Sequence, residues 1–229
     1  MDPVLEFFDF SATFDRKPEL PPISDNTLDK MLDSAAARAE DATTAGNIPR
    51  LAKALSDLRS LLRPNASFDR LSSTLSLATR HGHREVLKYL LAKSVPITAD
   101  AVTAATIAKD EWMLDLMVNS GWNVVEPLGL TTPSALALAV EDRGLVSWFL
   151  EHGASPNAQC SLDLTPLTIV VQFSSVSIIR SLFDYGGSVQ YGQVLHYAIR
   201  RYLPDQQEVL DLILSKNSLI NHVMYQEHP

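Results

Sequence analysis

Apolar residues recur along most of the chain in two alternating kinds of segment. One kind is rich in small residues and contains Ala78, Ala105 or Ala139. The other kind places Leu, Val and Ile at helical spacing, as in 86–91 and 145–150, and so forms one apolar face of a helix. The pattern therefore predicts pairs of short helices, in which a first helix of small residues can approach its neighbours closely.

Residues typical of helix ends separate these segments. Thr165 can cap a helix whose first position is Pro166, where the missing N–H has no cost, and Thr132-Pro133 is predicted to act in the same way. Glycine adopts a left-handed backbone easily, and it stands where the predicted helices end or turn. These glycines are Gly82, Gly121, Gly153 and Gly186.

The helix pairs form an internal repeat. The apolar residues that open successive units are separated by 27, 34, 31 and 28 residues, and they are Leu75, Val102, Leu136, Leu167 and Leu195. A single helix pair cannot bury its apolar faces, so such units must stack into a solenoid.

This repeat resembles the ankyrin repeat, with a Thr-Pro-Leu opening at 165–167, a His-Gly-His turn at 81–83 and a Gly-Ala-Ser-Pro-Asn ending at 153–157. The family period is about 33 residues, so several units are shortened, and the unit at 100–121 is the most degenerate. The resemblance implies an all-α ankyrin-repeat solenoid of stacked helix-turn-helix units with short β-hairpin-like fingers.

We divide the chain into three regions. Residues 1–25 are predicted to form an extended or disordered N-terminal arm, 26–68 a helical N-terminal cap or degenerate repeat, and 69–229 about five ankyrin-like repeats, the last one incomplete. Helices in the second region are expected at about 28–42 and 48–62. Because the last repeat stops inside a finger, we expect either that the native chain continues past Pro229 or that a partner covers this end.

The N-terminal arm combines aromatic and acidic residues with prolines further on. Its aromatic residues are Phe7, Phe8, Phe10 and Phe14, and its prolines include Pro18, Pro21 and Pro22. Three interpretations remain open, namely a disordered leader, an arm packed on the stack and a docking peptide for a partner.

The charge and composition narrow the choice of partner. A net charge of -8 opposes binding to nucleic acid and to anionic membranes, so we expect neither as a partner. No apolar run is long enough to span a bilayer, and the acidic start does not resemble a secretory signal. Cys160 is the only cysteine, which excludes an internal disulfide and fits a cytoplasmic or nuclear protein.

The resemblance implies that another protein binds on the concave side of the stack, so we expect a protein-protein interaction module such as an adaptor, scaffold or inhibitor. The candidate contacts on the concave face are Arg80, His81, Ile107, Glu141, Asp142, Gln172, Phe173, Arg200 and Arg201, which follow the small-residue helices. The candidate contacts in the fingers are Trp122, Asn123, Glu126, Gln159, Asp163, Gln190 and Tyr191. Exposed Trp, Tyr and Arg are enriched among binding hot spots.

Burial is predicted for several of these residues. Trp148 lies on an apolar helix face and is expected in the core, Trp112 is expected to be half-buried, and Trp122 is expected to point outward after Gly121. Phe173 and the pair 200–201 are expected to be exposed, so substitutions there are predicted to leave stability nearly unchanged.

Candidate catalytic and metal-binding residues are few. The pair at 81 and 83 lacks a cysteine or carboxylate cluster at ligand spacing, so we expect no metal, and such a turn histidine commonly binds nearby backbone in this family. His196 is expected to orient a turn, the acids 141–142 to be solvated, and Cys160 to be exposed in a finger without an activating group. We therefore expect no cofactor and no catalysis. The alternatives are a small-molecule-binding or catalytic protein using the groove as a pocket, and the repeat fragment of a larger regulatory chain; the oligomeric state is not predicted.

Overall fold

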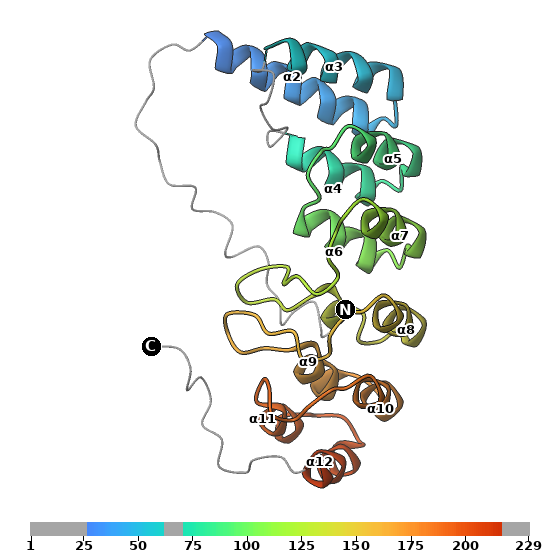
Figure 1. Ribbon diagram of the computed structural model, residues 1–229, viewed down its shortest axis with the longest axis vertical. Coiled ribbons are helices and arrows are strands. Elements are labelled where there is room, and N and C mark those ends of the chain that lie inside the picture. The colour runs from blue at the N-terminus through green and yellow to red at the C-terminus, as the bar shows by residue number, and fades with distance from the viewer. Residues whose placement is uncertain (1–26, 62–70, 217–229) are drawn as a thin grey trace.

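The computed structural model describes residues 27–61 and 71–216, and these form a single stack of helix pairs (Figure 1). The upper layers are α2 (Thr27–Thr44) with α3 (Ile48–Leu61), α4 (Ser72–Arg80) with α5 (Arg84–Ala92), and α6 (Ala99–Ile107) with α7 (Glu111–Asn119). The lower layers are the 3₁₀ turn η2 (Ala135–Leu138) with α8 (Arg143–Glu151), α9 (Pro166–Phe173) with α10 (Val176–Asp184), and α11 (Val194–Ile199) with α12 (Gln206–Ser215). The all-α ankyrin-type solenoid predicted from the sequence is confirmed.

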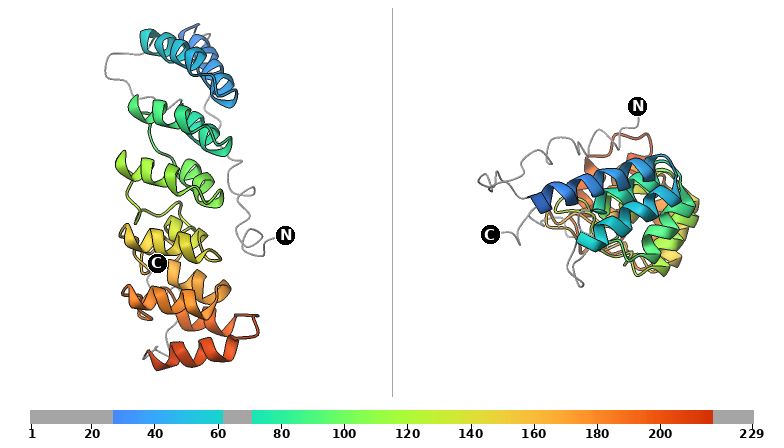
Figure 2. Two further views of the ribbon diagram at one scale, coloured as in Figure 1. Left: turned by 90° about the vertical axis from the view of Figure 1, so that its right-hand side faces the viewer. Right: turned by 90° about the horizontal axis from the view of Figure 1, so that it is seen from above.

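The layers lie one above another, and each contributes to two columns (Figure 2). The first helices of the pairs pack in the order α2, α4, α6, η2, α9 and α11, while α5 packs on α7 and α8 on α10. The long loops that join one layer to the next project from the first-helix side (Figure 1). We call the surface made by the first helices and these loops the loop-side face.

One continuous apolar core runs through the layers. The small residues predicted at the first helices are almost completely buried, namely Ala78, Ala105, Ala139 and Ala198. Larger side chains from the second helices, such as Leu87, Leu114 and Phe149, are fully buried beside them. Each such side chain contributes about 1.5–3 kcal/mol to stability. The layers therefore stabilise one another through contacts that no isolated helix pair has.

Helix starts follow the predicted capping chemistry in one unit and depart from it in another. Thr165 Oγ1 accepts a hydrogen bond from the Thr168 amide at 3.2 Å, and the Thr165 amide donates to Thr168 Oγ1 at 3.1 Å, with Pro166 at the first helical position. The prediction that Thr132 caps a helix beginning at Pro133 is wrong. Both residues belong to a loop instead. The Thr132 carbonyl accepts a hydrogen bond from the Gly129 amide, and the Pro133 carbonyl accepts one from the Leu128 amide.

The fingers are hairpin-shaped loops without sheet structure. Within 27–61 and 71–216 no residue forms a β-strand. The finger at 154–164 turns back through hydrogen bonds from the Cys160 amide to the Leu164 carbonyl and from the Asp163 amide to the Cys160 carbonyl, both 3.0 Å long. Asn157 ties this finger to the next one by donating to the Gly186 carbonyl and accepting from the Ser188 amide. Asn157 therefore holds two successive fingers together.

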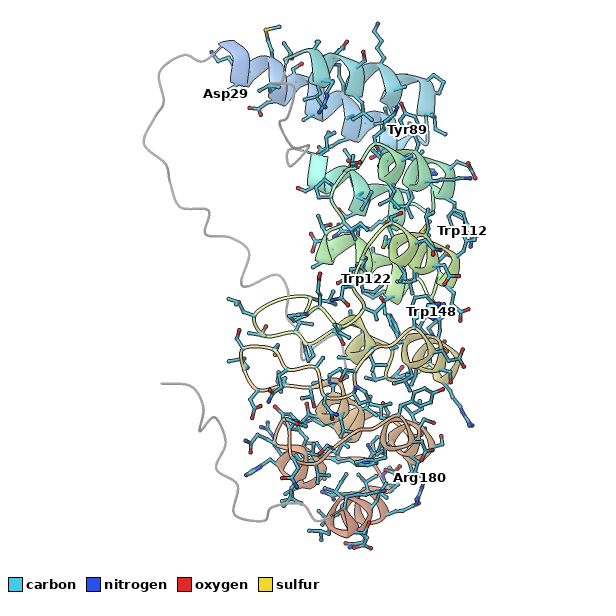
Figure 3. All side chains as sticks on the ribbon, viewed as in Figure 1. Asp29, Tyr89, Trp112, Trp122, Trp148 and Arg180 are labelled. Carbon is cyan, nitrogen blue, oxygen red and sulfur yellow. The ribbon has the colours of Figure 1, made fainter. Side chains whose placement is uncertain are left out.

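Two of the three tryptophans lie as predicted (Figure 3). Trp148 is 8% exposed, and its indole donates to Asp115 at 3.0 Å, whereas Trp112 is 38% exposed with the Arg84 guanidinium 5.3 Å from its ring centre. The prediction for Trp122 is wrong. It is only 9% exposed and meets Phe149 edge-on, because the chain folds back over the core directly after Gly121.

Polar contacts join the turn of each helix pair to the next layer, and we call this series the turn ladder. In the upper layers, His83 Nε2 donates to the Thr44 carbonyl at 3.0 Å, as its turn position predicts. The other upper contacts are the ion pairs Arg84–Asp110 and Lys109–Asp142, both 3.0 Å long. In the lower layers, the Ser174 hydroxyl donates to the Val140 carbonyl, and Arg201 reaches back to the turn that follows α9.

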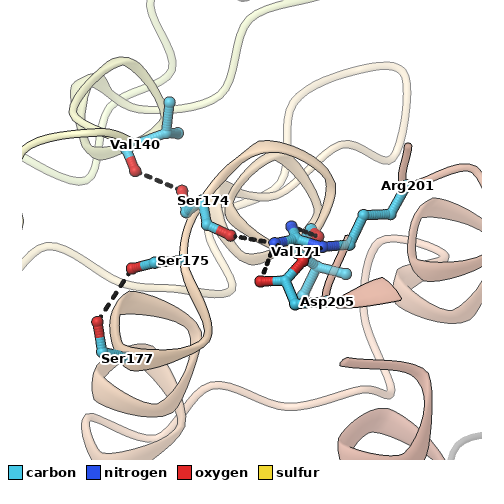
Figure 4. A network of polar contacts seen from close by, with 7 residues as sticks. All are labelled: Val140, Val171, Ser174, Ser175, Ser177, Arg201 and Asp205. Atoms are coloured by element: carbon cyan, nitrogen blue, oxygen red, sulfur yellow. Dashed lines mark hydrogen bonds and ion pairs between the residues drawn. The ribbon is translucent and has the colours of Figure 1, made fainter. Parts of the chain in front are cut away.

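Arg201 closes the last step of the turn ladder (Figure 4). Its guanidinium donates to the carbonyls of Val171 and Ser174 at 2.8 and 2.7 Å, and it pairs with the Asp205 carboxylate. The side chain is completely buried, so the predicted exposure of Arg201 is wrong. The adjacent Arg200 is exposed, as expected.

We predict that Arg201→Ala lowers the free energy of unfolding by about 3 kcal/mol or more, because it leaves two buried carbonyls and a partly buried carboxylate without their partner. Arg200→Ala is the matched control and should change stability by less than about 0.5 kcal/mol. Urea unfolding followed by circular dichroism measures both variants. Equal midpoints for the two variants would contradict the structural role of Arg201.

Candidate functional site

The loop-side face contains a groove of about 830 Å³ between α6 and the loop that follows α7. The lining residues are Arg80, Ala99, Asp100, Thr103, Ala104, Ile107, Ala108, Leu128, Gly129, Leu130, Thr131 and Thr132. Two of its large aliphatic side chains are well exposed, Ile107 at 54% and Leu130 at 77%. We call this feature the α6 groove.

Small side chains form the floor of the α6 groove. Ala99, Thr103 and Ala104 lie along one side of α6, and their short side chains leave room above the helix. The opposite side of the same helix holds Val102 and Ala105 in the core. Small residues thus occupy both sides of α6, the side that packs in the core and the side that faces the groove.

The wall opposite α6 is a locally ordered loop. The Leu128 amide donates to the Pro133 carbonyl at 3.1 Å, and the Gly129 amide donates to the Thr132 carbonyl at 3.3 Å. These bonds close a tight turn that holds Leu130 at its tip. Because the loop satisfies its own backbone, Leu130 can project into solvent without support from neighbouring layers.

The groove is mainly apolar, with a charge near each end of α6. Arg80 comes from the end of α4 and Asp100 from the first turn of α6, and both side chains are exposed. Covering exposed apolar surface is favourable, and contiguous apolar patches on a folded protein typically mark binding sites. The arrangement thus suits an apolar ligand that also carries charges of both signs.

The structure places the predicted concave-face residues in three groups. Arg80 and Ile107 line the α6 groove. His81, Glu141 and Arg200 are exposed outside it. The remaining four residues are buried or partly buried, namely Asp142, Gln172, Phe173 and Arg201.

The predicted exposure is wrong for two of those four residues besides Arg201. Gln172 is 7% exposed, and Phe173 is partly buried against the core. The predicted exposure of Phe173 is wrong because α9 is apolar on nearly all sides between its neighbouring layers.

The predicted finger residues are mostly exposed, but none of them lines the α6 groove. Five are at the surface, namely Asn123, Glu126, Gln159, Gln190 and Tyr191. Asp163 is partly buried and accepts hydrogen bonds from the side chains of Gln159 and Gln193, so it helps to shape its finger. The groove residues of the loop, Leu128 and Leu130, were missed by the sequence analysis. The sequence signal for these residues is a pair of leucines on either side of Gly129, in a segment that belongs to neither helix of a predicted pair.

Asp142 has a structural role at the start of α8. Its carboxylate accepts a hydrogen bond from the Leu145 amide at 3.0 Å and pairs with Lys109 of the layer above. The backbone hydrogen bond from Leu145, followed by the Lys109 ammonium, lowers the pKa of Asp142 below its ordinary value. Asp142 therefore caps a helix and joins two layers, and the expectation that the 141–142 pair is merely solvated is wrong for this residue.

The other candidate groups are also accounted for. Cys160 is 8% exposed, which corrects the expected exposure of its thiol. Neither His196 nor Glu141 lines the α6 groove. Across 27–61 and 71–216, no cluster of three or more His, Cys, Asp or Glu side chains is arranged to hold a metal ion. No helix in the same ranges combines the length and the apolar character required to cross a bilayer.

Comparison with known proteins agrees with the fold. Residues 136–223 match the family model described as ankyrin repeats in three copies. No curated protein sequence matches the chain. Among solved structures, the crystal structure of the human ASB11 ankyrin repeat domain shares 20% identity and a TM-score of 0.54, covering 82% of this chain and 87% of that one.

A second structural match is a chain of the complex between the Bd0816 predatory endopeptidase from Bdellovibrio bacteriovorus and immunity protein Bd3460. It shares 17% identity and a TM-score of 0.57, covering 78% of this chain and 97% of that one. At these identities both similarities show the fold alone. They cover more of this chain than the segment matched by the family model.

We predict that Asp142→Asn destabilises the protein at about pH 7, and that its difference from the natural protein shrinks as the pH falls below about 4. The folded pKa of Asp142 is depressed, so its stabilising effect is present above the pKa of the unfolded chain and is lost as the carboxylate becomes protonated. Urea midpoints measured across this pH range test the prediction. Glu141→Gln, at the exposed neighbour, should leave the midpoint at about pH 7 unchanged, and a constant deficit for Asp142→Asn at all pH values would refute the electrostatic explanation.

Proposed function

We propose that this chain, an ankyrin-repeat protein, binds another protein through the α6 groove. The observation that carries the proposal is the exposure of Ile107 and Leu130, which line the groove together with small side chains of α6. Ankyrin repeats are in general protein-interaction modules. The proposal applies this general role to one surface of this chain.

The size and form of the α6 groove support a macromolecular partner. Its volume of about 830 Å³ leaves room for a few large side chains of a partner. Its lining comes from α4, α6 and the loop at 128–132, so the groove lies along a helix and is open at the loop-side face. An extended or helical segment that inserts apolar side chains would cover it with little rearrangement.

The residues around the groove add specificity. Arg80 can orient an acidic group of the partner, and the exposed His81 and Glu141 add polar groups in the layers next to α6, with Arg200 further along the stack. A row of mixed charges favours one register of a bound segment over others and raises the association rate. The apolar centre and polar surroundings are the usual composition of a protein interface.

The work of the module is to hold its partner as an adaptor, scaffold or inhibitor. The structural match in the complex between an endopeptidase and its immunity protein shows that a chain of this fold is found in a protein complex. We expect a protein partner in preference to nucleic acid, because the chain carries a net charge of -8.

We predict that Ile107→Glu and Leu130→Glu each reduce partner binding at least tenfold, because each places a charge inside the apolar contact. The measurement is affinity capture with the full tagged chain, quantified by mass spectrometry, followed by titration of the captured protein. Both side chains are largely exposed, so the urea midpoint should change little.

Met31→Glu is the matched control for these variants. Met31 is 50% exposed on α2, two layers from α6 and outside the groove, so this variant introduces the same charge at a similarly exposed site. It should capture the same proteins as the natural chain. If folded Ile107→Glu and Leu130→Glu retain every protein that Met31→Glu retains, the groove is not the binding site.

A further inference from the structure

The α6 groove matches the chemistry of a segment in the same chain. Residues 1–26 lie outside the described residues, and their sequence places Phe7, Phe8, Phe10 and Phe14 among acidic residues. We propose that the aromatic segment 5–14 occupies the α6 groove when no partner is bound. This proposal rests on the proposed function, because it names the segment that fills the same groove in the free protein.

The apolar match is between large side chains and a small-residue floor. Aromatic side chains bury more apolar area than any others, and they need sites with room for a planar ring. The α6 groove offers this room over Ala99, Thr103 and Ala104, with Ile107 and Leu130 at its sides. Four phenylalanines within eight residues provide the aromatic side chains that such a site accommodates.

The charges match in one direction along the groove. Asp9 precedes the pair of aromatics at 10 and 14, and Arg16 follows it. A segment that runs antiparallel to α6 in this part would bring Asp9 toward Arg80 and Arg16 toward Asp100. The eight residues from 9 to 16 span between about 10 Å when helical and about 25 Å when extended, which brackets the length of α6, about 14 Å.

The same direction agrees with the point where the segment joins the stack. The helices α2, α4 and α6 all begin on the side from which the loops project (Figure 1). Thr27, at the start of α2, therefore lies over the Asp100 end of α6 and not over the Arg80 end. A chain that enters from Thr27 reaches Asp100 first, as the position of Arg16 requires.

The connecting residues are long enough for this path. Because α2 packs on α4 and α4 on α6, two helix-to-helix steps of about 8–10 Å separate Thr27 from the layer of α6. Residues 17–26 span up to about 33 Å when extended, and prolines at 18, 21 and 22 favour extended backbone. The linker thus reaches the groove within the same molecule, where tethering gives the segment a high effective concentration.

Disulfide trapping in the full chain tests this occupancy. In a Cys160→Ala background, one variant carries Ser11→Cys with Leu130→Cys, and the control carries Ser11→Cys with Glu151→Cys. Glu151 is exposed at the end of α8, on the second-helix side. We expect the intramolecular disulfide at 11 and 130 to form at least ten times faster than the one at 11 and 151, as measured by mass spectrometry and non-reducing gels.

Replacing the four phenylalanines by serine in the trapping variant should abolish the difference in rate. Equal rates for the pairs 130 and 151 in the original sequence would overturn the proposal. Predominantly intermolecular disulfides at 130 would also overturn it, because the segment of a second copy would then occupy the groove.

The outcome is separable from that of the proposed function. If trapping at 130 fails while Ile107→Glu still loses its partner, only the intramolecular occupancy is wrong. If trapping succeeds while the glutamate variants capture every partner, the groove holds the segment and the partner site lies elsewhere. If both are correct, replacing the four phenylalanines by serine should raise partner affinity, because the competing segment is removed.

Discussion

Successive helix pairs bury their apolar faces against one another, and the stability of every layer depends on this contact. Most first helices bury a small residue such as Ala78, Ala105 or Ala198, which lets neighbouring layers approach closely, and the second helices add large core side chains such as Leu87, Leu114 and Phe149. Since each layer is buried only by its neighbours, the relative placement of layers must be fixed by further contacts. The turn ladder provides them at one edge of the stack.

The turn ladder also decides which polar residues remain for binding. Asp110 and Asp142 each cap a second helix and pair with a cation, and Arg201 satisfies two backbone carbonyls. These three residues are thus committed to structure, whereas Arg80, His81, Glu141 and Arg200 stay exposed near the turns. The surface left for a partner is the loop-side face, where apolar residues are exposed and Arg80 and Asp100 supply the charges.

The sequence predicts the features that depend on local chemistry or on periodic burial. The apolar spacing of 86–91 predicts α5, the pattern Thr-Pro predicts the start of α9, and the apolar face predicts the burial of Trp148. The burial of Arg201 and Trp122 is different, because it depends on which side chains of other layers meet them. Nothing in the local sequence distinguishes Arg201 from the exposed Arg200. Its burial depends on hydrogen bonds to carbonyls that lie 27 and 30 residues earlier in the chain.

The α6 groove arises where the repeat is least regular. The first helix of the fourth pair is reduced to the 3₁₀ turn η2, and a long loop precedes it between α7 and η2. The starts of α4, α6 and α9 correspond to residues 133–135 in this unit, so the loop that carries Leu130 precedes the repeat helix and does not replace part of it. Because regular repeats present an even surface, a long hydrogen-bonded loop beside a small-residue helix leaves a hollow with an apolar wall. The departure from the repeat pattern that weakens family recognition in this region is therefore also the physical origin of its candidate binding site.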